Sequence, residues 1–152
     1  MTDIKDVCDA ALNDPSFKPK KGTTYCNLAV DWIADQMGCT EFDGLMADEI
    51  YQTMLTNKSG KWAKVDASDA TIWALSNGLA IAGLPSQRLG EAHGHVCVIY
   101  AVSMEPSSSL GHDVPMVANV GKSVGVMRSS QAFPVEDPSG KSLEADYFTY
   151  AG

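Results

Sequence analysis

The sequence predicts an α+β fold in which N-terminal helices pack on one face of an antiparallel sheet. Up to about Gly78, apolar residues recur every three or four positions, which is the helical period. After Gly78, short apolar runs alternate with loops rich in Ser, Gly and Pro, which is typical of strands. Helices followed by strands favour segregated layers, and 152 residues fit a single domain, residues 1–152.

Caps and breakers set the limits of four expected helices. The first begins at Thr2 or Asp3 and ends at Asn13-Asp14-Pro15, the second runs from Cys26 to Met37 before Gly38, the third runs from Leu45 to Thr56 before an Asn-Lys-Ser-Gly turn, and the fourth begins at Asp66 and ends at Gly78. Each expected helix carries an apolar stripe on one face, and the small polar or glycine residues at its ends are typical helix boundaries.

The expected strands are short apolar runs. They are a Trp62–Val65 segment between the third and fourth helices, then Leu79–Ala82, Val96–Val102, Pro115–Val120 and Tyr147–Tyr150. The run Val96–Val102 is the strongest because five of its seven residues are β-branched or aromatic. The segments Pro106–Gly111 and Gly121–Gly125 are expected to be loops.

The net charge of −8 restricts the classes of partner. Nucleic-acid binding needs basic patches, and anionic membranes attract basic segments, so neither partner is expected. No cofactor is expected. The first residues lack the basic-then-apolar pattern of a secretory signal, so we expect synthesis in the cytoplasm without a signal peptide. Nothing in the chain indicates an obligate dimer, and a monomer is expected.

The four cysteines, Cys8, Cys26, Cys39 and Cys97, show no paired C-x-x-C spacing. A structural zinc site of that type is therefore not expected, and the thiols are expected to be reduced. Cys8 and Cys39 are expected to be small apolar core residues, and Cys97 lies inside a predicted strand.

Cys26 is the strongest candidate for a catalytic residue. It follows the polar segment Thr24-Tyr25 at the start of the second expected helix. A cysteine in the first helical turn faces unpaired backbone N–H groups and the positive end of the helix dipole, which favour the reactive thiolate. The alternative is an ordinary buried thiol.

His95 is the candidate base, at the first residue of a strand where side chains from other elements converge. Strand alternation places it on one face with Cys97 and Ile99. Asn119, on the next strand, is the candidate for orienting the imidazole, since an apolar strand seldom holds an amide that has no hydrogen-bonding partner. A surface histidine, a turn-forming Asn119 and a metal site built on His93, His95 and Cys97 remain open alternatives.

A thiol hydrolase follows from these roles. His95 accepts the proton of the Cys26 thiol, the sulfur attacks an amide carbonyl, and the backbone N–H of Cys26 stabilises the oxyanion. Tyr25 is expected to contact the substrate or the oxyanion, or to pack before the helix.

The segments that carry these residues resemble a known family. Thr24-Tyr25-Cys26-Asn27-Leu28-Ala29-Val30, Ala47-Asp48, Trp62, Gly78-Leu79-Ala80-Ile81-Ala82-Gly83, Gly94-His95-Val96 and Asn119-Val120-Gly121 are similar to the papain-like bacterial cell-wall peptidases of the NlpC type. The pattern is most similar to that of the amidase effectors of type VI secretion and related phage peptidoglycan hydrolases. It covers roughly residues 20–150 and is most specific around Cys26 and His95.

The resemblance implies a papain-like fold, Cys26 as nucleophile, His95 as base and Asn119 as third member. It implies an amide bond in the peptide stem of peptidoglycan as substrate, cut in the periplasm or cell wall of a target cell after delivery by a secretion machine or phage lysis. An antibacterial effector would also need an immunity protein. The usual Asp and Ser beside the family's cysteine are replaced here by Tyr25 and Asn27. A peptidase or acyltransferase acting on another substrate, or a non-catalytic binding protein, is the alternative.

Overall fold

Helices precede most of the strands along the chain, as the sequence predicts. The computed structural model describes residues 2–152. The elements are α1 (Ile4–Leu12), the 3-10 helix η1 (Pro15–Phe17), α2 (Cys26–Gln36), α3 (Ala47–Thr56), β1 (Trp62–Val65), α4 (Ala67–Leu75), β2 (Ala80–Leu84), α5 (Ser86–Leu89), β3 (His95–Ile99), β4 (Glu105–Ser107), β5 (His112–Val114), β6 (Met116–Val120), β7 (Val124–Arg128), α6 (Ser129–Ala132) and β8 (Asp146–Tyr150). This arrangement confirms the α+β class.

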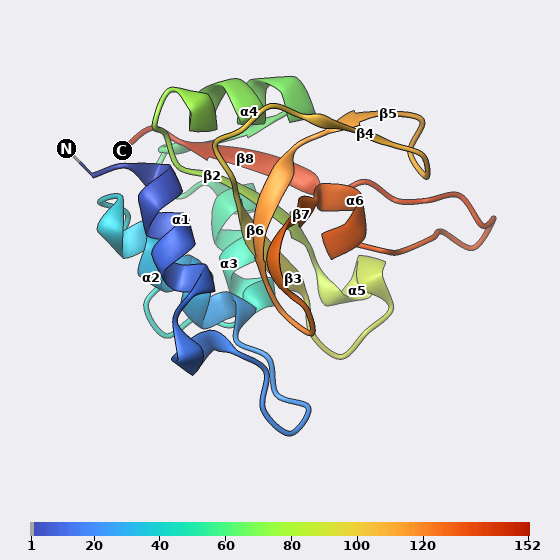
Figure 1. Ribbon diagram of the computed structural model, residues 1–152, viewed down its shortest axis with the longest axis horizontal. Coiled ribbons are helices and arrows are strands. Elements are labelled where there is room, and N and C mark those ends of the chain that lie inside the picture. The colour runs from blue at the N-terminus through green and yellow to red at the C-terminus, as the bar shows by residue number, and fades with distance from the viewer. Residues whose placement is uncertain (1) are drawn as a thin grey trace.

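Six strands form one antiparallel sheet in the order β1-β8-β2-β3-β6-β7 (Figure 1). The last strand of the chain, β8, inserts between β1 and β2, so that Phe148 pairs with Lys64 on one side and Ile81 on the other. Strands β4 and β5 form a separate hairpin that extends away from this sheet near α4 (Figure 1). The central strands β2 and β3 are therefore paired on both edges.

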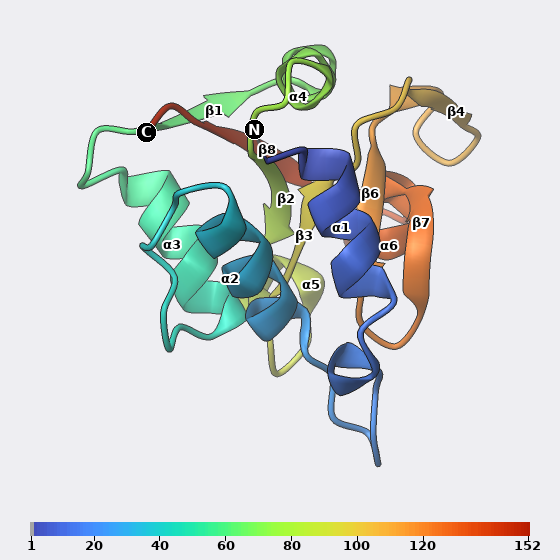
Figure 2. The same cartoon turned by 60° about the vertical axis from the view of Figure 1, so that its left-hand side comes forward.

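Apolar residues on both faces of the sheet are buried. Alternation along β3 sends Val96 and Val98 into a core with α1, α2 and α3, whereas Cys97 and Ile99 enter a second core with α4 and the end of α6. Figure 2 shows α1, α2 and α3 on one side of the sheet and α4 beyond its other side. The expectation that helices cover one face is therefore wrong, because the small residues on α4 pack against β2 and β8 from the opposite face.

The predicted helix limits agree closely with the structure. Asp3 caps α1 by accepting hydrogen bonds from the backbone N–H groups of Lys5 and Asp6. Asp66 caps α4 through the N–H of Asp69. Helix α2 begins at Cys26, as predicted.

Six short elements were not predicted from the sequence: η1, α5, β4, β5, β7 and α6. Helices α5 and α6 span four residues each, and β4 and β7 overlap segments that were expected to be loops. Strand β3 ends at Ile99, before the predicted limit of Val102. These elements are too short to show a hydrophobic period of their own.

Candidate active site

Cys26 is the first residue of α2, and the cap of that helix leaves backbone donors open. Tyr25 occupies the N-cap position without a side-chain hydrogen bond to the first turn, and the first intrahelical bond runs from the Ala29 N–H to the Tyr25 carbonyl. Free N–H groups therefore remain at the start of the helix. Those of Cys26 and Asn27 are directed at the sulfur, where they lower the thiol pKa.

The sulfur also lies against the start of β3. The backbone N–H of Val96, the residue after His95, lies close enough to the sulfur to lower the pKa of the thiol. Helix α2 packs along β3, and Cys26 and Val96 belong to the same core. Helix α2 thus brings Cys26 to the strand end that carries the predicted base.

Burial has the largest effect on the pKa of the Cys26 thiol. Cys26 is only 7 % exposed, and burial raises its pKa in spite of the three N–H donors. The expectation that the helix start yields a thiolate is therefore wrong, because desolvation of the anion outweighs the helix donors. In this structure Cys26 is a neutral thiol that needs a base for activation.

His95 and Asn119 are hydrogen-bonded, as the sequence predicts. The His95 Nε2 atom lies 2.6 Å from the Asn119 Oδ1 atom, and the Asn119 Nδ2 atom donates to the Ser123 carbonyl at 2.8 Å. The second bond fixes which end of the amide faces the ring. Because Oδ1 only accepts, Nε2 must carry the proton, and the lone pair of a neutral ring is then on Nδ1.

The surroundings of His95 keep the ring neutral. Its ring packs on Phe133, with the centroids 5.0 Å apart, and its Cε1 atom lies beside Gly121. Burial lowers the His95 pKa, against smaller opposing effects of the Asn119 hydrogen bond and of Glu91. A neutral imidazole with a free Nδ1 lone pair is suited to accept a proton near pH 7.

His95 and Asn119 meet beyond the paired part of β3 and β6. The two strands pair at Val98 with Ala118 and at Ile99 with Val117, and the paired residues stop there. His95 lies beyond this limit on β3, and Asn119 lies beyond it on β6. Within residues 2–152 there is no hydrogen bond between the Cys26 sulfur and the His95 ring: the ring packs on Phe133 of the core on the α4 side, whereas Cys26 belongs to the core with α1, α2 and α3.

A brace behind His95 was not predicted as a functional feature. Asp48, in the first turn of α3, accepts hydrogen bonds from the Ser86 backbone N–H at 2.7 Å and the Ser86 hydroxyl at 2.5 Å. A methyl group added at Gly94 would collide with the Asp48 carboxylate and lie 3.0 Å from the Leu84 carbonyl oxygen. Asp48 therefore holds the segment that leads into β3, and only glycine fits before His95 without a shift.

Two large apolar side chains near the start of α2 are exposed. Leu28 is 48 % exposed and Met46 is 52 % exposed. Asn27 connects α2 to the segment just before α3 by donating to the Leu45 carbonyl at 3.2 Å. Tyr25 is half-buried and packs against the core that contains Cys26, so packing is its observed role.

The alternative of a metal site is not supported by the arrangement of its three residues. Cys97 is 1 % exposed in the core on the α4 side, whereas His93 is exposed. The described part of the chain contains no group of three His, Cys, Asp or Glu side chains able to hold a metal ion. All four cysteines are free thiols, and Cys8 and Cys39 are fully buried, as predicted.

Two cavities lie away from Cys26. They have volumes of about 500 Å³ and 650 Å³ and share His112 and Asp113 in their walls. Neither is lined by Cys26, His95 or Asn119. His112 is exposed, lies on β5 and faces Glu144, with His112 Nε2 3.0 Å from a Glu144 carboxylate oxygen.

Comparison with known proteins gives no family assignment. No protein-family description and no curated sequence matches the chain. Among residues 2–152, no helix has the length and hydrophobicity needed to cross a membrane.

Proposed function

We propose that the protein is a cysteine hydrolase that cleaves amide bonds, with Cys26 as nucleophile, His95 as general base and Asn119 as the residue that orients the base. One observation carries this proposal: Asn119 fixes the His95 tautomer with Nδ1 free, at the strand end against which the Cys26 sulfur lies. A surface histidine has no need for this arrangement.

The reaction begins when the Cys26 thiol gives its proton to His95 Nδ1 as the sulfur attacks the amide carbonyl carbon. The resulting oxyanion accepts hydrogen bonds from free N–H groups at the start of α2. The His95 imidazolium then protonates the departing amine, and the C–N bond breaks to leave a thioester. Water, deprotonated by His95, hydrolyses the thioester and restores the thiol.

The proposed substrate is the peptide stem of bacterial peptidoglycan, by resemblance to the NlpC-type peptidases. Delivery to the wall of a target cell and an immunity partner are part of the same proposal.

Digestion of purified sacculi tests this function. Mass spectrometry of the released muropeptides is expected to show shortened stems with the wild-type protein and none with Cys26→Ser or His95→Gln. Cys39→Ser, a change of another buried thiol, is the matched control and is expected to retain activity. Unchanged stems with the folded wild-type protein, or full activity of Cys26→Ser, would contradict the proposal.

The burial of Cys26 favours a second candidate, a non-catalytic binding protein with this fold. A cysteine residue that is 7 % exposed, with a raised thiol pKa and no hydrogen bond to His95, is consistent with a thiol that never reacts. Thiol labelling separates the two candidates. A catalytic Cys26 reacts faster than the other three cysteines near neutral pH, whereas in a binding protein all four react slowly.

A further inference from the structure

A polar pocket of about 650 Å³ lies between the β4–β5 hairpin and α6. Its wall includes Ser107, Ser109, His112, Arg128, Ser130 and Gln131. Along the β6–β7 ladder, Arg128 pairs with Met116, whereas Asn119 pairs with Gly125 near the opposite end. The pocket is therefore separate from the candidate active site, and its properties do not depend on the proposed catalysis.

Arg128 lacks a carboxylate partner in a strongly acidic protein. The chain has 19 Asp and Glu residues against 11 Lys and Arg. Its other arginine, Arg88, pairs with Asp146 at 2.7 Å. Within residues 2–152, no carboxylate lies within ion-pair distance of Arg128, and its buried Nε atom has no hydrogen-bond partner. A guanidinium with unused donors on a pocket wall is suited to an anion from outside the protein.

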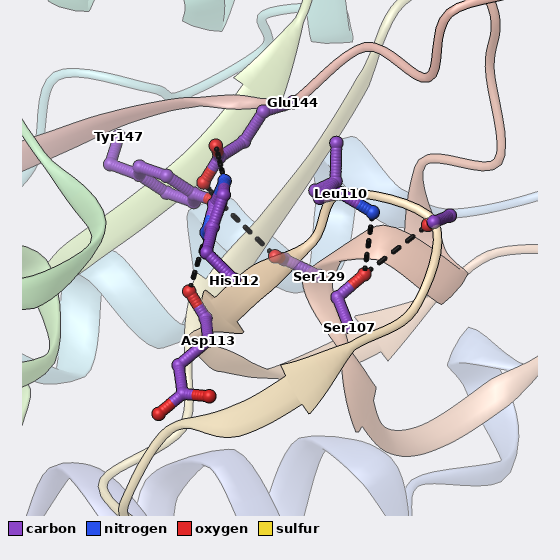
Figure 3. Close-up of polar contacts among 8 residues, drawn as sticks. Ser107, Leu110, His112, Asp113, Ser129, Glu144 and Tyr147 are labelled. Atoms are coloured by element: carbon purple, nitrogen blue, oxygen red, sulfur yellow. Dashed lines mark hydrogen bonds and ion pairs between the residues drawn. The ribbon is translucent and has the colours of Figure 1, made fainter.

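The neighbouring charges leave this guanidinium uncompensated. His112 Nδ1 lies 2.9 Å from the Asp113 carbonyl oxygen, and its Nε2 lies 3.0 Å from a Glu144 carboxylate oxygen (Figure 3). The Asp113 carbonyl and the Glu144 carboxylate raise the pKa of His112, and Glu144 pairs with the ring when the ring is protonated. The Asp113 side chain points away from the Ser107 hydroxyl in Figure 3. Among residues 2–152, no carboxylate lies within ion-pair distance of Arg128, and Asp113 is the acidic residue of the same pocket wall.

Serine hydroxyls supply further donors on two walls. Ser107, Ser108 and Ser109 come from the hairpin, and Ser130 comes from α6. Ser107 and Ser109 contact each other at 3.2 Å, which places two hydroxyls together. A planar carboxylate is satisfied by one guanidinium, whereas donors on several sides suit a tetrahedral group.

We propose that this pocket binds a phosphate group, with Arg128 as the charged donor and the serine hydroxyls of the hairpin and α6 around it. The group belongs to a small phosphorylated molecule or to a phosphate-containing polymer, which present the same chemistry to the pocket. The hairpin, fixed by the His112–Glu144 ion pair, forms one wall.

Titration with inorganic phosphate, followed by amide chemical shifts at pH 7 and constant ionic strength, tests the proposal. Saturable shifts are expected at the hairpin and around Arg128 in the full chain. Arg128→Gln is expected to raise the dissociation constant at least about tenfold, since a charged hydrogen bond is lost. Lys58→Gln, the same charge change at an exposed lysine outside the pocket, is expected to leave binding unchanged.

Two further variants and a titration with acetate complete the test. Ser130→Ala and Arg128→Lys are expected to weaken phosphate binding, and they replace Arg128→Gln if that variant does not fold. Acetate at the same concentration is expected to bind more weakly than phosphate. The proposal is overturned if phosphate gives no saturable shifts, if acetate binds equally well, or if Lys58→Gln weakens binding as much as Arg128→Gln. The titration is expected to be the same in Cys26→Ser, so loss of catalysis and loss of binding are read separately.

Discussion

Replacing Asn119 with alanine tests the orienting role most sharply. Asn119 is 4 % exposed and makes two hydrogen bonds, one with His95 Nε2 at 2.6 Å and one to the Ser123 carbonyl at 2.8 Å. Asn119→Ala removes both bonds. The imidazole is then free to rotate about its bond to Cβ or to move its proton to Nδ1, and either change removes the lone pair that accepts the thiol proton.

The structure sets the size of the expected effect. His95 becomes an imidazolium during the reaction, so its bond to Asn119 is a hydrogen bond to a charged group, which contributes about 1.5–3 kcal/mol. Since about 1.4 kcal/mol corresponds to a tenfold change in rate, kcat of Asn119→Ala is expected to fall about 10- to 150-fold. KM is expected to change little, because Asn119 is buried beneath the ring.

The assay is the initial rate of amine release from purified muropeptides, measured against pH. Activity needs neutral His95, and burial lowers its pKa, so the acidic limb of the wild-type profile is expected below the ordinary value of about 6.5. Asn119→Asp keeps an acceptor but places a negative charge beside Nε2, which raises the His95 pKa. Its acidic limb is therefore expected to move to higher pH.

Asn77→Ala is the control for loss of structure alone. Asn77 accepts a hydrogen bond from the Ile4 N–H at 2.6 Å and donates to the Thr2 carbonyl at 2.7 Å, far along the chain from His95. Its loss is expected to lower stability and leave kcat unchanged. The reasoning is refuted if folded Asn119→Ala keeps wild-type kcat, or if Asn77→Ala reduces kcat equally.

Three further predictions concern the surroundings of the site. Gly94→Ala is expected to reduce kcat at least about tenfold because the added methyl group displaces the Asp48 carboxylate. If this collision is the cause, the double variant Gly94→Ala with Asp48→Ala is expected to recover part of the lost kcat. In an NMR titration, His95 is expected to titrate below about 6.5, where burial lowers its pKa, and His112 above it, where the Asp113 carbonyl and Glu144 raise its pKa. The contribution of His95 to the free energy of unfolding is therefore lost as pH falls below about 6.5, and the contribution of His112 is lost as pH rises through its pKa in the folded protein. The reverse order of titration would contradict both assignments. Tyr147→Phe is expected to lower the free energy of unfolding by about 1–3 kcal/mol in urea denaturation, since it removes bonds to Ser129 and Glu144, and no change would contradict that role.

Local patterns in the sequence predicted the features that depend on neighbouring residues. The polar segment before Cys26 and the apolar stripe after it fixed the start of α2. Alternation along β3 assigned Cys97 and Ile99 to one face, and they share a core in the structure. The inward amide of Asn119 needed a partner, and the structure provides His95.

Features that arise from distant contacts were not predictable in this way. The thiol of Cys26 is buried by elements that are far away in sequence, so the donors at the helix start gave the wrong direction for its pKa. Asp48 meets Gly94 only because α3 packs beside the end of β2. The position of β8 between β1 and β2 is a long-range pairing that no local period encodes.

The rate of alkylation of Cys26 by iodoacetamide, resolved by peptide mapping at several pH values, tests the central claim most directly. If His95 activates Cys26, this thiol reacts fastest of the four near pH 7, and His95→Gln slows it at least about tenfold. If Cys26 labels no faster than Cys8, Cys39 and Cys97, or at the same rate in His95→Gln, then His95 does not activate Cys26 and the proposed mechanism is wrong.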